Sequence, residues 1–124
     1  MSKIIINEQI NSSNGKENIN NKKAILKDNK ISYERNGFIM KIIIDDEKIY
    51  VIRENNNVKM NLEFKKDQSL TTKYIIKDMN TGVDLKTVTK KLSIQDNRIC
   101  IEYDLYMNDK FSDNFEFKLE WRNL

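Results

Sequence analysis

A few polar side chains interrupt otherwise apolar strand faces, and these residues have the clearest potential for chemistry in the sequence. Glu8 shares its alternation phase with Ile4, Ile6 and Ile10. Arg53 shares its phase with Ile49 and Val51, and Thr72 lies between Leu70 and Tyr74 on one phase. Charges on the interior side of a sheet are costly unless they are paired or hydrated. Glu8 and Arg53 therefore either reach water at the ends of their strands or line a wet cavity that orients an anionic or polar ligand. We take Glu8, Arg53, Thr72 and Tyr74 as candidate ligand-binding residues.

Composition excludes most catalytic and cofactor chemistry. The 124 residues include no histidine, which removes Ser-His-Asp triads, Cys-His dyads and His-ligated zinc or haem. The single cysteine, Cys100, excludes an intramolecular disulfide and any CxxC site. Three glycines, at 15, 37 and 82, are too few for a phosphate-binding or dinucleotide-binding loop. We therefore expect no catalytic residues, no cofactor and no enzyme activity.

Two acidic segments resemble metal-binding loops without matching one in detail. The run DMNTGVD at 78–84 places glycine at the fifth position of a calcium loop instead of the sixth, and Thr89 stands where the twelfth position needs glutamate. The segment 45–47, Asp-Asp-Glu, lies at an expected strand reversal, where acidic residues are commonly solvated. Both segments are predicted to be turns, and no metal site is expected.

The charge of the chain is small and evenly spread. The 22 basic and 19 acidic residues give +3, and the longest basic runs are pairs of lysines. Nucleic-acid-binding proteins concentrate positive charge on one face or in one run. RNA or nucleotide binding through lysines and exposed Tyr33, Tyr50 or Tyr106 is therefore the weakest of the functional hypotheses. The first apolar run, Ile4–Ile6, is too short for a signal peptide, and no segment is long enough to cross a bilayer. These features predict a cytoplasmic protein without membrane association.

Apolar residues alternate with a period of two almost throughout the chain, as in 58–64 and 115–121. Successive side chains of a strand point to opposite faces, so such segments are half-buried strands. Between them lie Asn, Asp and Gly, which tolerate the positive φ of tight hairpins. The predicted strands cover residues 3–11, 16–27, 30–36, 38–45, 48–54, 58–65, 70–78, 83–94, 98–107 and 113–122.

Short connections make consecutive strands antiparallel neighbours. A sheet of about eight to ten such strands closes into a barrel because closure removes the exposed edges. The apolar phase changes within 83–94, which predicts a β-bulge near Thr87–Val88. The chain 1–124 is therefore expected to be one all-β domain, an antiparallel up-and-down barrel. Trp121, on the apolar phase of the last strand, is expected to be buried.

The order of four sequence blocks resembles the YwiB-like family of small bacterial proteins. The blocks are NVKMNLEF at 57–64, KY at 73–74, GVDLKTVTK at 82–90 and RICIEYDLY at 98–106. The resemblance extends over nearly the whole chain, although the hairpin around 77–82 is longer here. Proteins of this family have unknown function and a lipocalin-like fold. The resemblance therefore implies a lipocalin-like or calycin-like barrel and assigns no functional residues.

Several strands carry apolar residues on both faces, although a barrel wall that faces water needs only one apolar side. Ile39, Ile43, Tyr50 and Ile52, in two successive strands, lie on the second face. We expect these residues to form an exterior patch that serves a homodimer or a partner protein. The alternative is that the segment 3–11 or a long loop of the same chain covers the patch.

Two main functions remain open. The first is a non-catalytic barrel that binds a small apolar or anionic molecule, because small barrels can hold one ligand. The second is a structural or protein-interaction module with a filled lumen. The volume of any cavity in the lumen distinguishes the two. The side chains available to fill it are Phe38, Met40, Phe64, Tyr74, Tyr103, Phe115, Phe117 and Trp121.

Overall fold

The computed structural model describes all 124 residues, and they form ten β-strands joined by short turns. No helix of the chain has the length and apolarity that a bilayer span requires. The strands are β1 (Ser2–Ser12), β2 (Gly15–Lys27), β3 (Lys30–Arg35), β4 (Phe38–Asp45), β5 (Lys48–Glu54), β6 (Val58–Lys65), β7 (Ser69–Ile76), β8 (Thr81–Gln95), β9 (Arg98–Met107) and β10 (Lys110–Asn123).

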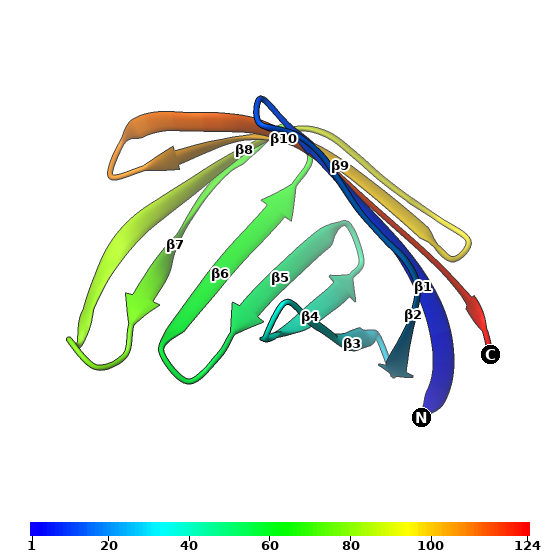
Figure 1. Cartoon of the computed structure of the whole chain (residues 1–124). Coiled ribbons are helices and arrows are strands. Elements are labelled where there is room, and N and C mark those ends of the chain that lie inside the picture. The colour runs from blue at the N-terminus through cyan, green and yellow to red at the C-terminus, as the bar shows by residue number, and fades with distance from the viewer.

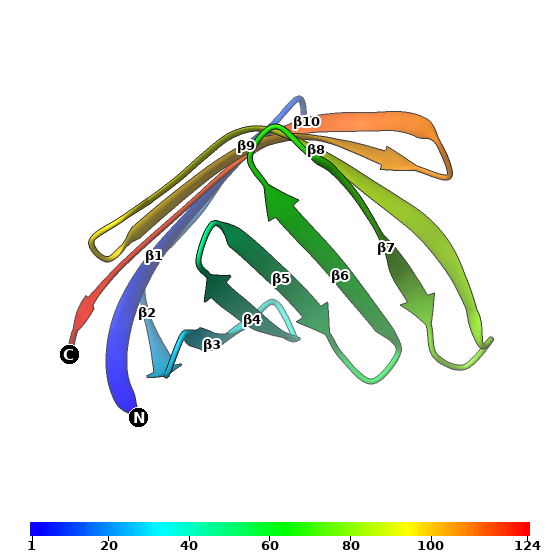
Figure 2. The ribbon, with the colours of Figure 1, turned by 180° about the vertical axis from the view of Figure 1, so that it is seen from behind.

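The ten strands form one closed antiparallel barrel. Each strand pairs with its neighbours in sequence, and β1 pairs with β10 to close the sheet (Figures 1 and 2). This confirms the all-β, up-and-down architecture predicted from the alternation pattern. The predicted ranges agree closely with the observed strands, and the largest difference is at β10, which begins at Lys110 rather than at residue 113.

Asparagine and aspartate build the chain reversals, as the sequence pattern predicts. Five of these residues lie in predicted turns with φ between 52° and 61°. Their short polar side chains tolerate this left-handed conformation. The longer hairpin near 77–82 has a defined register, because Ile76 pairs with Thr81. The five turn residues are Asp28, Asn36, Asp46, Asp67 and Asn97.

A β-bulge bends β8, but it lies beyond the predicted position. The pairing of β8 with β9 shifts between Thr89 and Lys91. Val88 lies opposite Asp104, between the buried Thr87 and Thr89, so it faces outward and the alternation is still regular there. The alternation pattern hides the shift because threonines, rather than apolar residues, occupy the interior positions before it. Thr89 and its neighbour Thr87 are both buried there.

The lumen is filled by a core of 17 buried apolar residues. Phe64 is 1% exposed, and its ring centroid lies 4.5 Å from that of Tyr103, which in turn stacks on Phe115 at 5.4 Å. Trp121 packs against this core but is only half-buried. The prediction that Trp121 is buried is therefore wrong: the indole lies near the end of β10 and borders a polar pocket with Asp96 and Asn97.

The sheet is nearly interrupted at two places. The β2–β3 seam has three residue pairs, between 25–27 and 30–32, and the β6–β7 seam has three, between 58–60 and 74–76. At the β6–β7 seam, side chains replace the missing ladder bonds. The hydroxyl of Thr72 donates to the carbonyl oxygen of Asn61, and that of Thr87 donates to the carbonyl oxygen of Glu63 at 2.5 Å. Unpaired backbone carbonyls are thereby satisfied.

Candidate functional site

A row of interior side chains crosses five strands near one end of the barrel. In this row Tyr33, Met40, Arg53, Met60 and Tyr74 are successive cross-strand partners on β3 to β7. We call these five residues the girdle. It lies near the distal end of the barrel, which carries the turns at 36–37, 55–57 and 77–80 and faces away from the two termini (Figure 1).

Two of the predicted ligand-binding residues, Arg53 and Tyr74, belong to this girdle. They lie on either side of Met60, with backbones roughly 10 Å apart because neighbouring strands are about 4.8 Å apart. The Arg53 guanidinium carbon lies 3.9 Å from the centroid of the Phe38 ring. No carboxylate or other acceptor contacts the Arg53 guanidinium, so its donors remain available.

The third predicted residue, Glu8, is neutralised by groups that sequence analysis did not identify. Glu8 is 2% exposed, and one of its oxygens accepts a hydrogen bond from the hydroxyl of Tyr33. Its other oxygen lies 2.8 Å from Nε of Arg35, an ion pair in which the N–H does not point along the hydrogen-bond line. The terminal nitrogen of Arg35 lies 2.5 Å from Glu17. The interior alternation of Ile31, Tyr33 and Arg35 is the signal that could have identified these partners.

This Glu8 cluster joins strands across the β2–β3 seam. Tyr33 and Arg35 come from β3, Glu17 comes from β2, and Glu8 comes from β1 beyond it. The β2 strand departs from β3 at a bulge where its pairing with β1 shifts and Asn21 has a φ of 56°. The polar cluster therefore closes the barrel where backbone hydrogen bonds do not.

Burial is the main influence on the protonation of this cluster. It raises the pKa of Glu8 above the ordinary value of 4.5, while the hydrogen bond from Tyr33 and the charge of Arg35 oppose the rise. Burial, followed by the negative charge of Glu8, raises the pKa of Tyr33 above its ordinary 10.0. The Tyr33 hydroxyl thus keeps its proton and serves as a donor to Glu8.

Stability should depend on pH through Glu8. Because its pKa is raised in the folded state, Glu8 contributes stability that is fully present below 4.5 and is lost as pH rises through the folded pKa. The Glu8→Gln variant cannot titrate at this position. We expect the unfolding free energy of wild type minus that of Glu8→Gln, from urea titrations between about pH 4 and about pH 8, to fall as pH increases.

The subtraction isolates Glu8 from groups that act in the opposite direction. Three other acidic residues have lowered pKa values because they accept hydrogen bonds: Glu34, Glu54 and Asp113. Their contribution to the stability of the folded protein is therefore lost as pH falls. Their contributions are common to both proteins. A difference that is constant over this pH range would contradict the raised pKa of Glu8.

The fourth predicted residue, Thr72, has a structural role in this fold. It lies on the interior phase of β7, one alternation step from Tyr74, but its hydroxyl donates to the Asn61 carbonyl across the β6–β7 seam. The hydroxyl is thus engaged within the sheet. Thr72 as a ligand-binding residue stays a prediction, and the structure does not bring it into the girdle.

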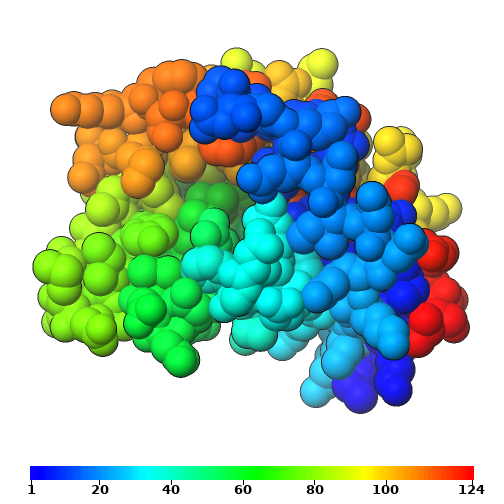
Figure 3. All heavy atoms as spheres, viewed as in Figure 1, coloured from blue at the N-terminus to red at the C-terminus, as the bar shows by residue number.

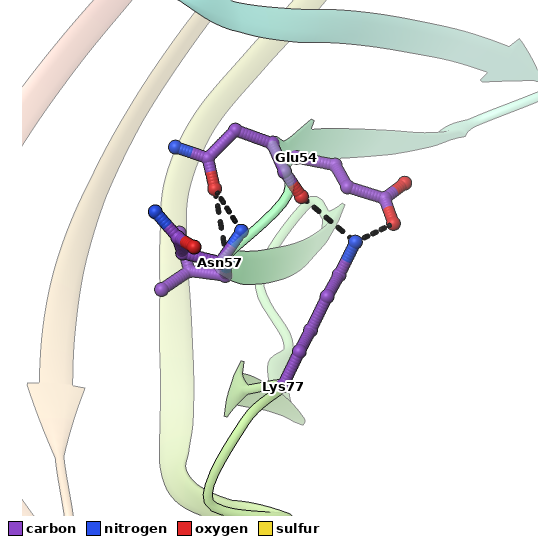
Figure 4. A network of polar contacts seen from close by, with 5 residues as sticks. Glu54, Asn57 and Lys77 are labelled. Atoms are coloured by element: carbon purple, nitrogen blue, oxygen red, sulfur yellow. Dashed lines mark hydrogen bonds and ion pairs between the residues drawn. The ribbon is translucent and has the colours of Figure 1, made fainter.

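The rim beside Arg53 and Tyr74 is held by a polar network that links two turns (Figure 4). The ammonium group of Lys77 lies 2.7 Å from Glu54 and 2.8 Å from the carbonyl oxygen of Asn55. The Asn55 side chain accepts hydrogen bonds from the backbone N–H groups of Asn57 and Val58 at 2.8 and 2.9 Å. Two neighbouring distal turns are therefore fixed relative to each other.

None of the five main pockets is lined by Arg53, Thr72 or Tyr74. Glu8 borders a polar pocket of about 220 Å³ with Asn7 and Arg98. The distal face has a recess between the β9–β10 hairpin and the strands β3 to β6 (Figure 3). A ligand held by the girdle would therefore rest at the barrel rim rather than deep inside the lumen.

The residues of the predicted exterior patch are only partly exposed. Ile39 is 49% exposed, whereas Ile43, Tyr50 and Ile52 are half-buried. The ammonium group of Lys48 lies 4.8 Å from the centre of the Tyr50 ring and covers part of it. The strand β1 does not cover this patch, because it pairs with β2 and β10. A homodimer through this face stays a prediction, which the solution mass from light scattering tests.

Comparison with known proteins gives a family and a fold. A family model described as a domain of unknown function, DUF1934, matches residues 4–119. The crystal structure of the YwiB protein from Bacillus subtilis has a TM-score of 0.57 and 22% identity, over 95% of this chain and 89% of that chain. At this identity the similarity shows the fold alone. No curated protein matches the sequence. The family match covers nearly the whole chain and agrees with the resemblance noted in the sequence, so the chain belongs to the DUF1934 family, whose function is unknown.

Proposed function

We propose that this protein is a non-catalytic binding barrel that holds a small anionic molecule at its distal rim. The observation that carries the proposal is Arg53, an arginine on the interior face of the sheet whose guanidinium has no acidic partner. Interior charges are normally paired because an unpaired one is costly. An anionic ligand would supply the missing partner.

The contrast between Arg53 and Arg35 supports this assignment. Both lie on the interior phase near the distal end, but Arg35 contacts the carboxylates of Glu8 and Glu17. The positive charge of Arg35 is therefore compensated within the protein, whereas that of Arg53 is not. The planar guanidinium of an arginine suits bidentate recognition of a carboxylate or phosphate.

The surroundings of Arg53 combine rigidity with an adaptable apolar wall. The Phe38 ring supports one face of the guanidinium, and the network around Lys77 fixes the adjoining turns. Met40 and Met60 flank Arg53 on the two neighbouring strands, and methionine packs readily against ligands of different shapes. The hydroxyl of Tyr74 offers a further donor in the same row.

Native mass spectrometry of gently purified protein tests the proposal, with Arg53→Leu and Arg98→Leu as a matched pair. We expect the wild type to retain a small molecule and Arg53→Leu to lose it, with at least about a tenfold drop in occupancy at limiting ligand, since a hydrogen bond to a charged group contributes about 1.5–3 kcal/mol. Arg98 is exposed on β9 and outside the girdle, so Arg98→Leu should retain the molecule.

Two results would contradict binding at the rim. Equal retention by Arg53→Leu and wild type would place the ligand elsewhere. Protein that carries no small molecule at all would instead support the second candidate, an interaction module, which is favoured by the filled lumen.

A further inference from the structure

Among the five main pockets, the one with the most hydrophobic lining is a groove on the outer wall at the β2–β3 seam. It has a volume of about 490 Å³, and six of its ten lining residues are hydrophobic. Ile25 on β2 and Ile39 on β4 border it with 42% and 49% of their surface exposed. Leu124, which follows β10, also lines it and is 68% exposed. We call this pocket the seam groove.

The seam groove exists because the sheet parts at this position. Only three residue pairs join β2 to β3. Past these pairs the two strands separate, and the gap between them leaves core side chains open to the outside of the barrel. The residues Ile4, Ala24 and Tyr33 are buried members of the core, yet they line the groove. At this position the core itself therefore contributes to the outer surface.

Charge beside the groove is positive and uncompensated. Lys3 and Lys23 both line it, are exposed and make no ion pair. The single acidic side chain in the lining, Glu34, already contacts the ammonium group of Lys22 at 3.0 Å and accepts a hydrogen bond from the backbone N–H of Gly37 at 2.9 Å. The two free ammonium groups are thus available to an anionic group placed over the apolar surface.

We infer that the seam groove is a second binding site, which takes a small amphipathic anion with an aromatic or alkyl body and a single acidic head. Its volume lies in the range of about 300–1,000 Å³ that is typical of small-molecule sites. Its mostly apolar lining with a few polar groups also has the composition of such sites. The body would cover Ile25 and Ile39, and the head would lie beside Lys3 and Lys23. The seam groove shares Tyr33 with the girdle, but it does not include Arg53, and the inference does not rest on the proposed rim site.

A matched pair of fluorescent probes tests both parts of the inference. 1-Anilinonaphthalene-8-sulfonate has an aromatic body with a sulfonate head, and N-phenyl-1-naphthylamine has the same body without the charge. We expect the folded wild type to bind one equivalent of the sulfonate and to bind the neutral probe more weakly. The double variant Lys3→Gln/Lys23→Gln should lower the affinity for the sulfonate probe roughly three- to tenfold, as expected for the loss of two exposed charge pairs. Its affinity for the neutral probe should be unchanged.

Apolar variants locate the probe on the molecule. Ile39→Ser should lower the affinity for both probes, because it removes apolar surface from the groove. Ile39 is partly exposed, so the substitution leaves the core intact. Ile94→Ser is the matched control, because Ile94 is 37% exposed on β8 and lies outside the groove. Circular dichroism of each variant confirms that the fold is retained.

Three results would overturn the inference. The first is the absence of sulfonate binding by the folded protein. The second is equal weakening by Ile39→Ser and Ile94→Ser, which would indicate diffuse adsorption. The third is loss of the probe in Arg53→Leu alone, which would place it at the rim; that outcome would count against the seam groove while leaving the proposed function standing.

Discussion

Replacing Phe64 with alanine is expected to lower the free energy of unfolding by about 3–5 kcal/mol, the range for truncating a large core aromatic. Phe64 is 1% exposed, and its ring packs on that of Tyr103, which stacks in turn on Phe115. The truncation would remove both the buried surface and one member of this aromatic series. Chemical denaturation monitored by circular dichroism measures the change.

Phe111→Ala is the control for this prediction. Phe111 is 57% exposed and contacts Tyr106 at the edge of the β9–β10 hairpin. Its truncation should change stability by less than about 1 kcal/mol, because surface substitutions have small effects. Similar losses for both variants would contradict the assignment of Phe64 to the centre of the core.

The second large effect is expected from Arg35→Met. This variant removes the cation beside Glu8 and leaves a carboxylate with 2% exposure beside only a tyrosine hydroxyl. Breaking a buried pair by removing one partner typically costs about 3–5 kcal/mol. Because Glu17 would also lose its partner across the β2–β3 seam, the loss should include a weaker closure of the barrel. Urea denaturation at neutral pH measures it.

A double-mutant cycle separates the pair from its surroundings. Adding Glu8→Gln to Arg35→Met removes the buried carboxylate that has lost its cation, so the double variant should be more stable than Arg35→Met alone. Arg122→Met is the surface control, because Arg122 is exposed and its guanidinium hydrogen-bonds to the side chain of Asn21 without an acidic partner. A loss below about 1 kcal/mol for Arg35→Met would show that the cluster is open to water, since surface ion pairs contribute no more than that.

Much of the fold can be predicted from the sequence because its determinants are local. Alternation fixes which face of each strand is apolar, and Asn or Asp at positive φ fixes where the chain reverses, as at Asn36 and Asp67. The position of the β8 bulge could not be predicted this way, because polar Thr87 and Thr89 occupy interior positions. The positions of the two short seams, β2–β3 and β6–β7, could not be predicted either. They depend on how the whole barrel closes rather than on the sequence of any single strand.

The candidate site was only partly predictable for the same reason. Alternation places Glu8, Arg53 and Tyr74 on the interior face, but it does not reveal which of them meets a partner. Glu8 lies opposite Tyr33 and Arg35 only because β2 bends away and brings β1 and β3 within reach. That juxtaposition is a property of the closed barrel, so sequence spacing alone cannot distinguish the paired Glu8 from the unpaired Arg53.

The two seams have a consequence for the order in which the barrel assembles. They bound a four-stranded unit, β3 to β6, that is continuous in the chain from 30 to 65. Its contacts are between sequence neighbours, whereas β1 meets β10 only after a long loop is closed, as in the pairing of Ile4 with Asn123. Local contacts form faster than those that require long loops. This meander is therefore expected to behave as one cooperative unit in native-state hydrogen exchange, with its amides opening together and separately from those of the β1–β10 pair.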